Sequence, residues 1–468
     1  MSAEYSRKQK KQINGLAKGQ VSRDLKVLNR NVAGIDISPK FHAVAVPVGS
    51  SKDGQDTKCF QTTTDALFEM TDWLISCGVT SVAMESTGVY WIPPRNILEA
   101  HGLEVILVHA PNFRNVPGRK TDIQDAEWLQ TLHSYGLLRG CFQPCPEGQV
   151  LRAYVRGRKR LTEDKSKQVL RMQKALDQMN VLVHRAVGDI TGVTGMKIIQ
   201  AIVDGERDPK ILAQNRVYQC HKTEEQIASY LYGHYREHLI FELRQSLETY
   251  RHLLQQIREV DEAIEKWLTK IIPEETISLD DEICERLGKK KIKRKEPGFN
   301  AGLYAYKLLG VDLTEIKGVG PSTVMVFLAE AGWDMSRWPT VSHFTSWLCL
   351  CPGNHKSGGK SYSGKKRRTS NHLSQALRQS AEALAGSKSE LGEIYRRHKR
   401  KGGAVQAIVN TAHKLARILY TMVKNKTPYD PGELEKADTK RRRRKTQDLK
   451  KEAKALGYEL VPLEAAVA

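Results

Sequence analysis

Four carboxylates stand at positions where they could hold a divalent cation. Asp36 lies within the apolar run Gly-Ile-Asp-Ile-Ser, where a buried charge is costly unless it binds a cation or accepts hydrogen bonds. Glu85 ends a second apolar run, and ligand sites in open α/β sheets gather where strands end. Asp122 and Asp125 are three residues apart, so a helix would present both on one face.

Each acid also has an ordinary structural interpretation. Asp36 could face solvent at a strand edge, because successive residues of a strand point to opposite faces. Asp122 could be the N-cap of a helix, and Asp125 a first-turn acid that interacts well with the helix dipole.

Taken together, the four acids indicate a metal site. Carboxylates on two strands and one helix can surround a pair of Mg²⁺ ions, which prefer oxygen ligands. Two such ions about 4 Å apart activate an attacking oxygen and stabilise the leaving oxygen of a phosphodiester. Arg119 and Lys120 come just before the two aspartates and would hold nucleic-acid phosphates nearby.

The elements that must position these acids are predicted to form a mixed α/β domain. Two β-branched runs separated by Pro39-Lys40-Phe41 predict a hairpin. Strands and helices then alternate, which is typical of an α/β unit. The predicted strands are 32–38, 42–48, 81–86 and 104–110, and the predicted helices are 64–78, 91–102 and 121–136.

A long helical region follows. Residues 234–272 contain neither glycine nor proline, and apolar residues recur at steps of three and four along 169–183 and 243–268. This spacing predicts two long antiparallel helices or an intermolecular coiled coil, with Asp261 interrupting the second seam. An ordinary helical bundle is the alternative, because only about three heptads are continuous.

Two glycine-rich segments further along could contact phosphates. Gly318 and Gly320 precede Pro321, and in a helix-hairpin-helix such a turn offers backbone N–H groups to DNA. An ordinary glycine-rich helix connection would look the same. Ser357 lies in Lys-Ser-Gly-Gly-Lys, where glycines let a phosphate approach and lysines offset its charge. The basic residues of this second segment are Lys356, Lys360, Lys365, Lys366, Arg367 and Arg368.

Composition indicates a polyanionic partner. The chain of 468 residues has 74 lysines and arginines against 53 acidic residues, a net charge of +21, which favours nucleic acid over a small-molecule substrate. No apolar run approaches the roughly 20 residues that span a bilayer. The eight cysteines lack zinc-knuckle spacing and no secretory signal is evident, so we expect a reduced, intracellular protein without a membrane partner.

These features divide the chain into five regions. We expect a basic arm, an α/β domain, a helical region that ends in a basic linker, a compact helical domain and a basic tail. Their ranges are 1–30, 31–146, 147–305, 306–425 and 426–468. The tail contains Lys-Arg-Arg-Arg-Arg-Lys at 440–445, and a run of this kind is usually a solvated, mobile segment that contacts phosphates without sequence preference.

The acidic motifs resemble those of a known family. GIDIS (34–38), MESTGVYW (84–91) and GRKTDIQDAEWL (118–129) are similar to the three acidic motifs of the DEDD transposases of insertion sequences. The segment 343–377 resembles the C-terminal motif of the same family, in which the serine before glycine corresponds to Ser357. The family also includes pilin-inverting recombinases and bridge-RNA-guided recombinases. The resemblance covers about 31–187 and 306–425, and the chain departs from compact members in 188–305 and after 426.

The resemblance implies a fold and a set of roles. The fold would be an RNase H-like, RuvC-type α/β domain, a coiled-coil middle and a mainly α-helical transposase domain with a helix-hairpin-helix-like motif. Asp36, Glu85, Asp122 and Asp125 would bind Mg²⁺, and Ser357 would be the nucleophile. Ser361 and Ser363 share the loop with Ser357 and could compete for that role.

The resemblance also implies partners and an activity. A homo-oligomer, expected to be a tetramer, would bind donor and target DNA and a non-coding bridge RNA in the bacterial cytoplasm, associated with the nucleoid. The activity would be site-specific recombination. Two alternatives stay open, namely a metal-dependent nuclease of Holliday-junction type that uses water instead of serine, and a non-catalytic nucleic-acid-binding scaffold.

Overall fold

The computed structural model describes residues 26–86, 88–108, 121–272, 280–351, 355–358, 360–362 and 371–459. The chain forms two compact units, of which the first ends at Gln143 and the second begins at Pro144. All eight cysteines lie in the described ranges, and each is a free thiol. Within these ranges, no helix combines the length and apolar character that crossing a membrane requires.

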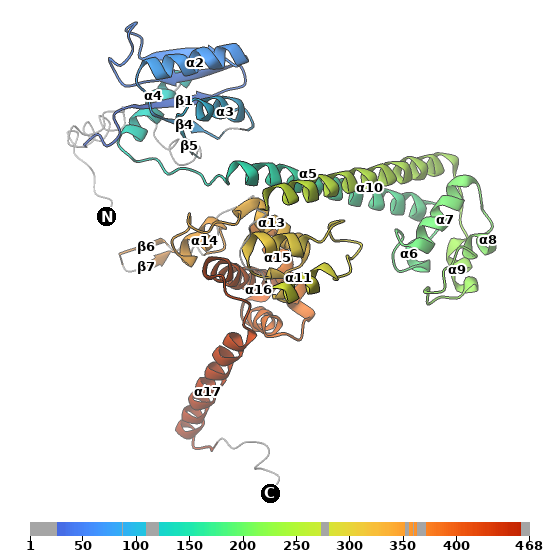
Figure 1. The fold of residues 1–468 in the computed structure, drawn as a ribbon. Coiled ribbons are helices and arrows are strands. Elements are labelled where there is room, and N and C mark those ends of the chain that lie inside the picture. The colour runs from blue at the N-terminus through green and yellow to red at the C-terminus, as the bar shows by residue number, and fades with distance from the viewer. Residues whose placement is uncertain are drawn as a thin grey trace, which may run out of the picture. The chain divides into compact units, whose positions relative to one another are not determined.

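The first unit is built on a five-stranded mixed sheet (Figure 1). Its strands lie in the order β3-β2-β1-β4-β5, with β1–β2 and β2–β3 antiparallel and β1–β4 and β4–β5 parallel. The α/β class predicted for this unit is therefore confirmed. The strands are β1 (Val32–Ile37), β2 (Phe41–Ala45), β3 (Thr57–Gln61), β4 (Ser81–Glu85) and β5 (Glu104–Val108).

Helices cover both faces of this sheet. One face carries the larger core, in which Ile35 of β1 and Met84 of β4 pack with residues of α2 (Thr64–Ser76) and α3 (Ile92–Ala100). The opposite face is covered by α4 (Asp122–Ser134), whose Ala126 packs on β2 and whose Leu129 packs on β5. The alternation of side chains along each strand therefore separates a core face from a face that meets α4.

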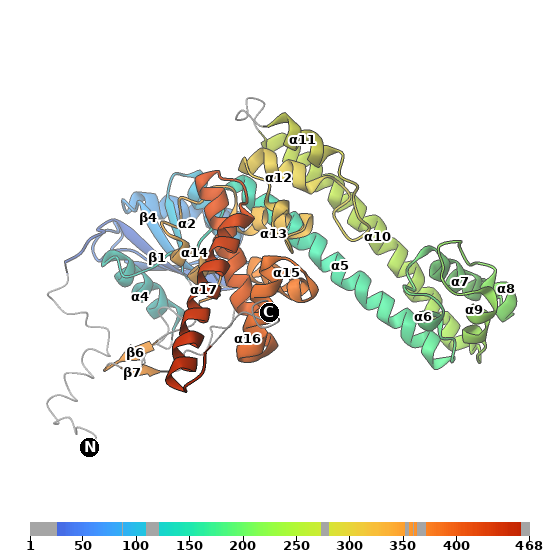
Figure 2. The ribbon, with the colours of Figure 1, turned by 90° about the horizontal axis from the view of Figure 1, so that it is seen from below.

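The second unit begins with a hairpin of two long helices (Figure 2). Helices α5 (Pro146–Gln178) and α10 (Glu237–Ile271) pack side by side and antiparallel, as the heptad spacing predicted. Between them the chain forms a bundle of four short helices at the tip of the hairpin. These are α6 (Val183–Ala186), α7 (Val193–Asp204), α8 (Pro209–Ala213) and α9 (Glu224–Leu231).

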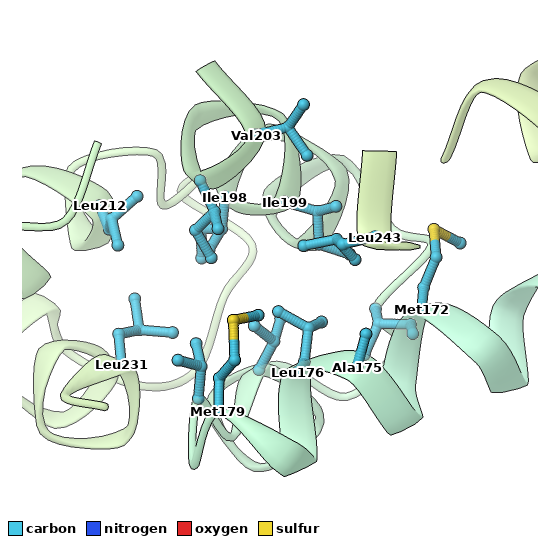
Figure 3. Packing of buried hydrophobic residues seen from close by; sticks show 14 of the residues in the cluster. Met172, Ala175, Leu176, Met179, Ile198, Ile199, Val203, Leu212, Leu231 and Leu243 are labelled. Atoms are coloured by element: carbon cyan, nitrogen blue, oxygen red, sulfur yellow. The ribbon is translucent and has the colours of Figure 1, made fainter. Parts of the chain in front are cut away.

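The tip bundle and the hairpin share one apolar core. Figure 3 shows Met172 and Leu176 of α5 facing Ile198 and Ile199 of α7, with Leu243 of α10 close by. Most of the predicted seam of α10 is buried. At the turn of Leu254 the buried residue is instead its neighbour Leu253, so Leu254 lies at the edge of the seam.

Asp261, which interrupts the seam in the sequence, is buried in an ion pair. The Arg158 guanidinium of α5 donates to both of its carboxylate oxygens, with Nη2 3.1 Å from Oδ2. The backbone N–H of Gly298 also donates to Oδ2, at 2.9 Å. The break in the heptad pattern is therefore a specific polar link between α5, α10 and the basic linker that follows them.

The rest of the second unit is mainly helical, as predicted. Helix α16 is interrupted at Gly402 and Gly403, whose backbone angles are not helical. The elements are α11 (Asp281–Gly288), α12 (Ala301–Leu309), η2 (Leu313–Glu315), α13 (Pro321–Ala331), α14 (Val341–Trp347), β6 (His355–Ser357), β7 (Lys360–Tyr362), α15 (His372–Ala383), η3 (Leu384–Gly386), α16 (Glu390–Asn425) and α17 (Pro431–Ala455).

The basic tail contains a helix that the sequence analysis did not predict. Residues 431–455, including the run of cations at 440–445, form the single helix α17, of which no described residue is buried. Lysine, arginine, glutamate and alanine all have high helix propensity, and they dominate this stretch. The pattern of charges by itself does not reveal this helix propensity.

Candidate active site

Small residues bring α4 into direct contact with the sheet. A Cβ atom on Gly34 of β1 would lie 2.3 Å from the carbonyl oxygen of Ala126 and 2.4 Å from the backbone nitrogen of Gln130. Beside it, Ala43 and Ala45 of β2 pack against Ala126. The helix backbone therefore rests on the strand backbone, and this close approach fixes where the first turn of α4 lies.

Two of the four acids lie side by side at the ends of parallel strands. Asp36 follows Gly34 by two residues, so it belongs to the face that meets α4. The parallel register pairs Gly34 with Ala83 and Ile35 with Met84, and the next step of that register places Asp36 beside Glu85. Asp36 is half-buried and Glu85 is 4% exposed, so Asp36 is not a solvent-facing edge residue.

The other two acids occupy the first turn of α4. Thr121 is the N-cap, because its side chain accepts a hydrogen bond from the backbone N–H of Gln124 at 3.3 Å. The alternative interpretation of Asp122 as the N-cap is therefore wrong, and Asp122 is the first residue inside the helix. Asp122 is exposed and Asp125 is half-buried. Both belong to the helix end whose dipole favours negative charge.

The far end of α4 is fixed by contacts that sequence reasoning missed. The buried His133 Nε2 lies 3.0 Å from Ser81 Oγ of β4, and burial lowers the pKa of His133, with Glu104 opposing that shift. The side chain of Asn29 donates to the His133 carbonyl at 2.9 Å. Leu28 donates its backbone N–H to Ser134. The alternation of Gly34, Ala43 and Ala45 was the one sequence signal for such a close helix.

The carboxylates share an end of the sheet without forming a compact cluster. Among the residues that the structure describes, no group of three or more histidine, cysteine, aspartate or glutamate side chains lies close enough to hold a metal ion. The donor set is entirely oxygen and comes from two neighbouring strands and one helix start, which suits the chemistry of Mg²⁺. Arg119 and Lys120 lie outside the described residues.

Ser357 belongs to the second unit, at the tip of a small hairpin. Strands β6 and β7 pair antiparallel, with Ser357 opposite Lys360 and Lys356 opposite Ser361. Gly358 follows Ser357 in the turn with φ of +57°, a left-handed conformation that favours glycine. The backbone thus presents Ser357 directly before a tight turn. The remaining loop residues of interest, Ser363, Lys365, Lys366, Arg367 and Arg368, lie outside the described residues.

The helices around this loop are anchored by aromatic packing and hydrogen bonds. On α14, Phe344 packs against Trp338 with ring centroids 5.1 Å apart and against Tyr420 of α16 at 5.6 Å. The Tyr420 hydroxyl donates to the Trp338 carbonyl at 2.6 Å. The Lys159 Nζ atom of α5 lies 2.9 Å from Nδ1 of His372, the first residue of α15. The segments that enter and leave the serine loop are therefore both held in place.

A buried glutamate joins α5 to α13. Glu330 is 4% exposed, and the Arg156 guanidinium donates to its two oxygens at 2.8 and 2.9 Å. Arg152 donates to the backbone carbonyls of Ala329 and Glu330. Burial lowers the pKa of Arg152 to about 10. This ionic contact was not foreseen from the sequence.

The glycine-rich turn before α13 has two parts. Gly318 has φ of +88°, and its Cβ would lie 2.9 Å from Leu384 Cγ, so packing and backbone conformation both require glycine there. Gly320 is the N-cap of α13, with Pro321 at the first helical position and open space where a Cβ would be. Gly320 therefore leaves room for a phosphate, whereas Gly318 is explained by packing against η3.

Comparison with known proteins places the chain in a family. A DEDD transposase family model, described as transposase, matches residues 33–181. A second model, described as the transposase IS116/IS110/IS902 family, matches residues 312–396. The first range contains all four acids and the second contains Ser357. The two matches follow each other in the order that the sequence resemblance implies. The chain belongs to the IS110/IS116/IS902 family of DEDD transposases.

One curated relative supports the same grouping. The chain is 29% identical over 126 residues to a protein of Pseudomonas aeruginosa (strain PAO1) named "Probable family 20 transposase". The alignment covers 26% of this chain and 37% of that relative. The likeness thus spans little more than a third of the relative's length.

Proposed function

We propose that the protein is a site-specific DNA recombinase that cuts and rejoins DNA strands during transposition. The observation that carries the proposal is the parallel register of β1 and β4, whose next step puts Asp36 beside Glu85, together with the two aspartates at the start of α4. Carboxylates gathered at that end of a sheet suit phosphodiester chemistry. The net charge of +21 suits a polyanionic substrate.

The four acids would hold Mg²⁺. Asp36 and Glu85 come from the sheet, and Asp122 and Asp125 come from the start of α4. When bound, Mg²⁺ polarises a phosphodiester and stabilises the charge that develops on its oxygens. The contribution of the chain itself is geometric, because the contact at Gly34 sets the separation between the helix acids and the strand acids.

Ser357 would be the nucleophile of strand cleavage. Its hydroxyl oxygen attacks phosphorus, a bond from serine to phosphorus forms, the bond to one deoxyribose oxygen breaks, and that oxygen takes up a proton. The phosphoserine retains the energy of the phosphodiester, so attack by a new strand's hydroxyl restores Ser357 and needs no nucleotide hydrolysis. A serine hydroxyl is a weak nucleophile on its own, and activation would come from the acid site, on the same or another subunit.

The partners would be donor and target DNA, a non-coding bridge RNA and further copies of the chain, as a tetramer. Base pairing with the RNA would supply sequence choice while the protein contacts backbone and shape. Lys356, Lys360 and Gly320 would then contact phosphates, as would Arg119, Lys120 and the basic residues 365–368. Copurified nucleic acid, sequenced after protease digestion, would identify the RNA.

The decisive experiment asks whether DNA becomes covalently attached to the protein. A reaction with Mg²⁺ and a DNA site, stopped by denaturation, should leave protein on one DNA end. Ser357→Ala should remove both the adduct and the joined product while changing DNA affinity little, because one neutral hydroxyl contributes about 1 kcal/mol. Ser361→Ala is the matched control, since that serine lies in the same hairpin.

The outcomes separate the candidate functions. Loss of the adduct in Ser361→Ala but not in Ser357→Ala would mean that the other serine is the nucleophile. Cleavage that leaves only free ends would favour the water-using nuclease. Tight binding with no cleavage by the wild type would favour the scaffold.

Asp36→Asn tests the acid site separately. It keeps the side-chain shape and removes a ligand charge, so cleavage should be lost while DNA and RNA binding stay close to wild type. Near-normal cleavage in Mg²⁺ would contradict the four-acid site.

A further inference from the structure

The C-terminal helix α17 has no part in the proposed chemistry. It begins at Pro431, beyond the residue at which the second family match ends. In Figure 1 it is the long red helix that follows α16. It carries ten lysines and arginines against five acidic residues, and six of the cations are consecutive, at 440–445. A helix of this composition requires a physical account of its own.

Packing against the protein core does not explain why α17 is helical. None of the described residues of α17 is buried, and Leu449 is 42% exposed. Helices in globular proteins owe most of their stability to an apolar face that packs on the core. A helix that is polar on every side gains nothing from such packing. A partner that stabilises α17 must therefore be anionic.

The distribution of charge around the axis narrows the kind of partner. Successive residues of an α-helix are about 100° apart around the axis, so six consecutive cations occupy positions on all sides of the helix. A flat anionic surface would contact one side only. Cations on every side suit a helix that has phosphates on both flanks, as it would within a groove of a duplex.

The dimensions select the type of duplex. An α-helix with its side chains is roughly 10–12 Å wide, and the major groove of B-form DNA is about 12 Å wide. The major groove of A-form RNA is too deep and narrow for side chains to read.

We infer that α17 lies in the major groove of B-form DNA and contacts phosphates of both strands. Arg443 and Arg444 are well placed for this, because both are exposed and lie within the run of cations. The inference rests on the proposed function only in taking DNA as the substrate. It adds a second DNA-binding element, separate from the serine loop and the acids.

The first test is the salt dependence of DNA affinity. Full-length protein carrying Asp36→Asn, so that no strand is cut, is titrated with a B-form duplex at several salt concentrations. Adding Arg443→Gln and Arg444→Gln should reduce the slope of log affinity against log salt by about 2, because each phosphate contact contributes about 0.9. Lys291→Gln with Lys293→Gln removes the same charge from exposed positions of the linker, and should change the slope less.

The second test locates the contact. Dimethyl sulfate methylates guanine N7 in the major groove and adenine N3 in the minor groove. Bound protein should protect N7, and the Arg443→Gln/Arg444→Gln variant should lose that protection while N3 reactivity stays the same. Arg443→Lys with Arg444→Lys, which keeps the charge, should retain the slope.

Three results would overturn the inference. They are N7 protection that survives loss of the arginine pair, an equal change of slope in the lysine control, and tighter binding to an RNA duplex than to the DNA duplex. Because no strand is cut in these assays, their failure is distinguishable from failure of the recombinase proposal. Melting curves should be unchanged, since both arginines are exposed.

Discussion

Replacing Gly34 by alanine tests how the acid site is assembled. The added Cβ would lie 2.3 Å from the Ala126 carbonyl oxygen and 2.4 Å from the Gln130 nitrogen, where ordinary contact begins at 3.4 Å. Both neighbours are helix backbone, which cannot rotate aside as a long side chain would. Helix α4 must therefore retreat from β1 by about 1 Å, the difference between 3.4 and 2.3 Å.

The cost follows from the kind of contact. Overpacking a core typically costs about 1–3 kcal/mol, and backbone contacts place Gly34→Ala near 3 kcal/mol. For a unit of this size we expect the melting temperature to fall by roughly 10 °C. Asp122 and Asp125 move with the helix, and in the proposed mechanism a displacement of about 1 Å of these acids costs about 100-fold in rate. DNA cleavage should therefore fall about 100-fold at temperatures where the variant is folded.

The assay combines calorimetric melting with Mg²⁺-dependent cleavage measured well below the melting temperature. Gly288→Ala is the control, because nothing lies within 4 Å of the Cβ it would add and its φ is not positive. Its melting and cleavage should match wild type. If Gly34→Ala melted and cleaved like wild type, the close packing of α4 on β1 would be refuted. If it melted lower but cleaved normally, the position of α4 would not matter for the chemistry.

Three further predictions concern other parts of the molecule. Leu247→Asp places a charge at a position that is 1% exposed and should lower the free energy of unfolding by about 4 kcal/mol. Leu254→Asp, at a half-buried position, should lower it less. Equal losses for the two variants in chemical denaturation would contradict the observed seam. Glu330→Ala leaves two arginines without their carboxylate partner and should lower the free energy of unfolding by about 3 kcal/mol. This is the low end for a buried ion pair, because Arg156 keeps 40% of its side chain exposed. An unchanged denaturation midpoint would show that the contact is not formed. The pKa of His133 is lowered in the folded state, so the wild-type protein loses stability as pH falls below about 6.5. The difference in unfolding free energy between wild type and His133→Gln should therefore shrink from about pH 7.5 to about pH 5. A difference that grew over this range would contradict the direction of the pKa shift.

The elements that sequence reasoning found are those with a strong local period. The long helices α5 and α10 repeat apolar residues over many turns, and β1, β2, β4 and β5 are rich in apolar residues. Strand β3 (Thr57–Gln61) was missed, because it is a short edge strand with several polar residues. Helices α6 and α8 of the tip bundle were missed for a similar reason, since they have only four and five residues and show no period.

The four acids illustrate a different limit of prediction from sequence. Motif resemblance selected Asp36 and Glu85, but only the strand register places them next to each other. Thr121 as the N-cap could have been read from the Thr-Asp sequence, yet Asp122 is an equally good capping residue. Contacts such as Glu330 with Arg156 join residues 174 positions apart, and no local pattern in the sequence encodes them.

The tip bundle enters and leaves the hairpin at almost the same point. The backbone N–H of His234 donates to the Met179 carbonyl at 2.8 Å, so 54 intervening residues, 180–233, begin and end side by side. A segment with adjoining ends can be lengthened, shortened or exchanged during evolution while the helices that carry it keep their length and direction. The hairpin thus offers a natural grafting point, where a foreign domain with closely spaced termini could replace the bundle if it covered the apolar ends of α5 and α10.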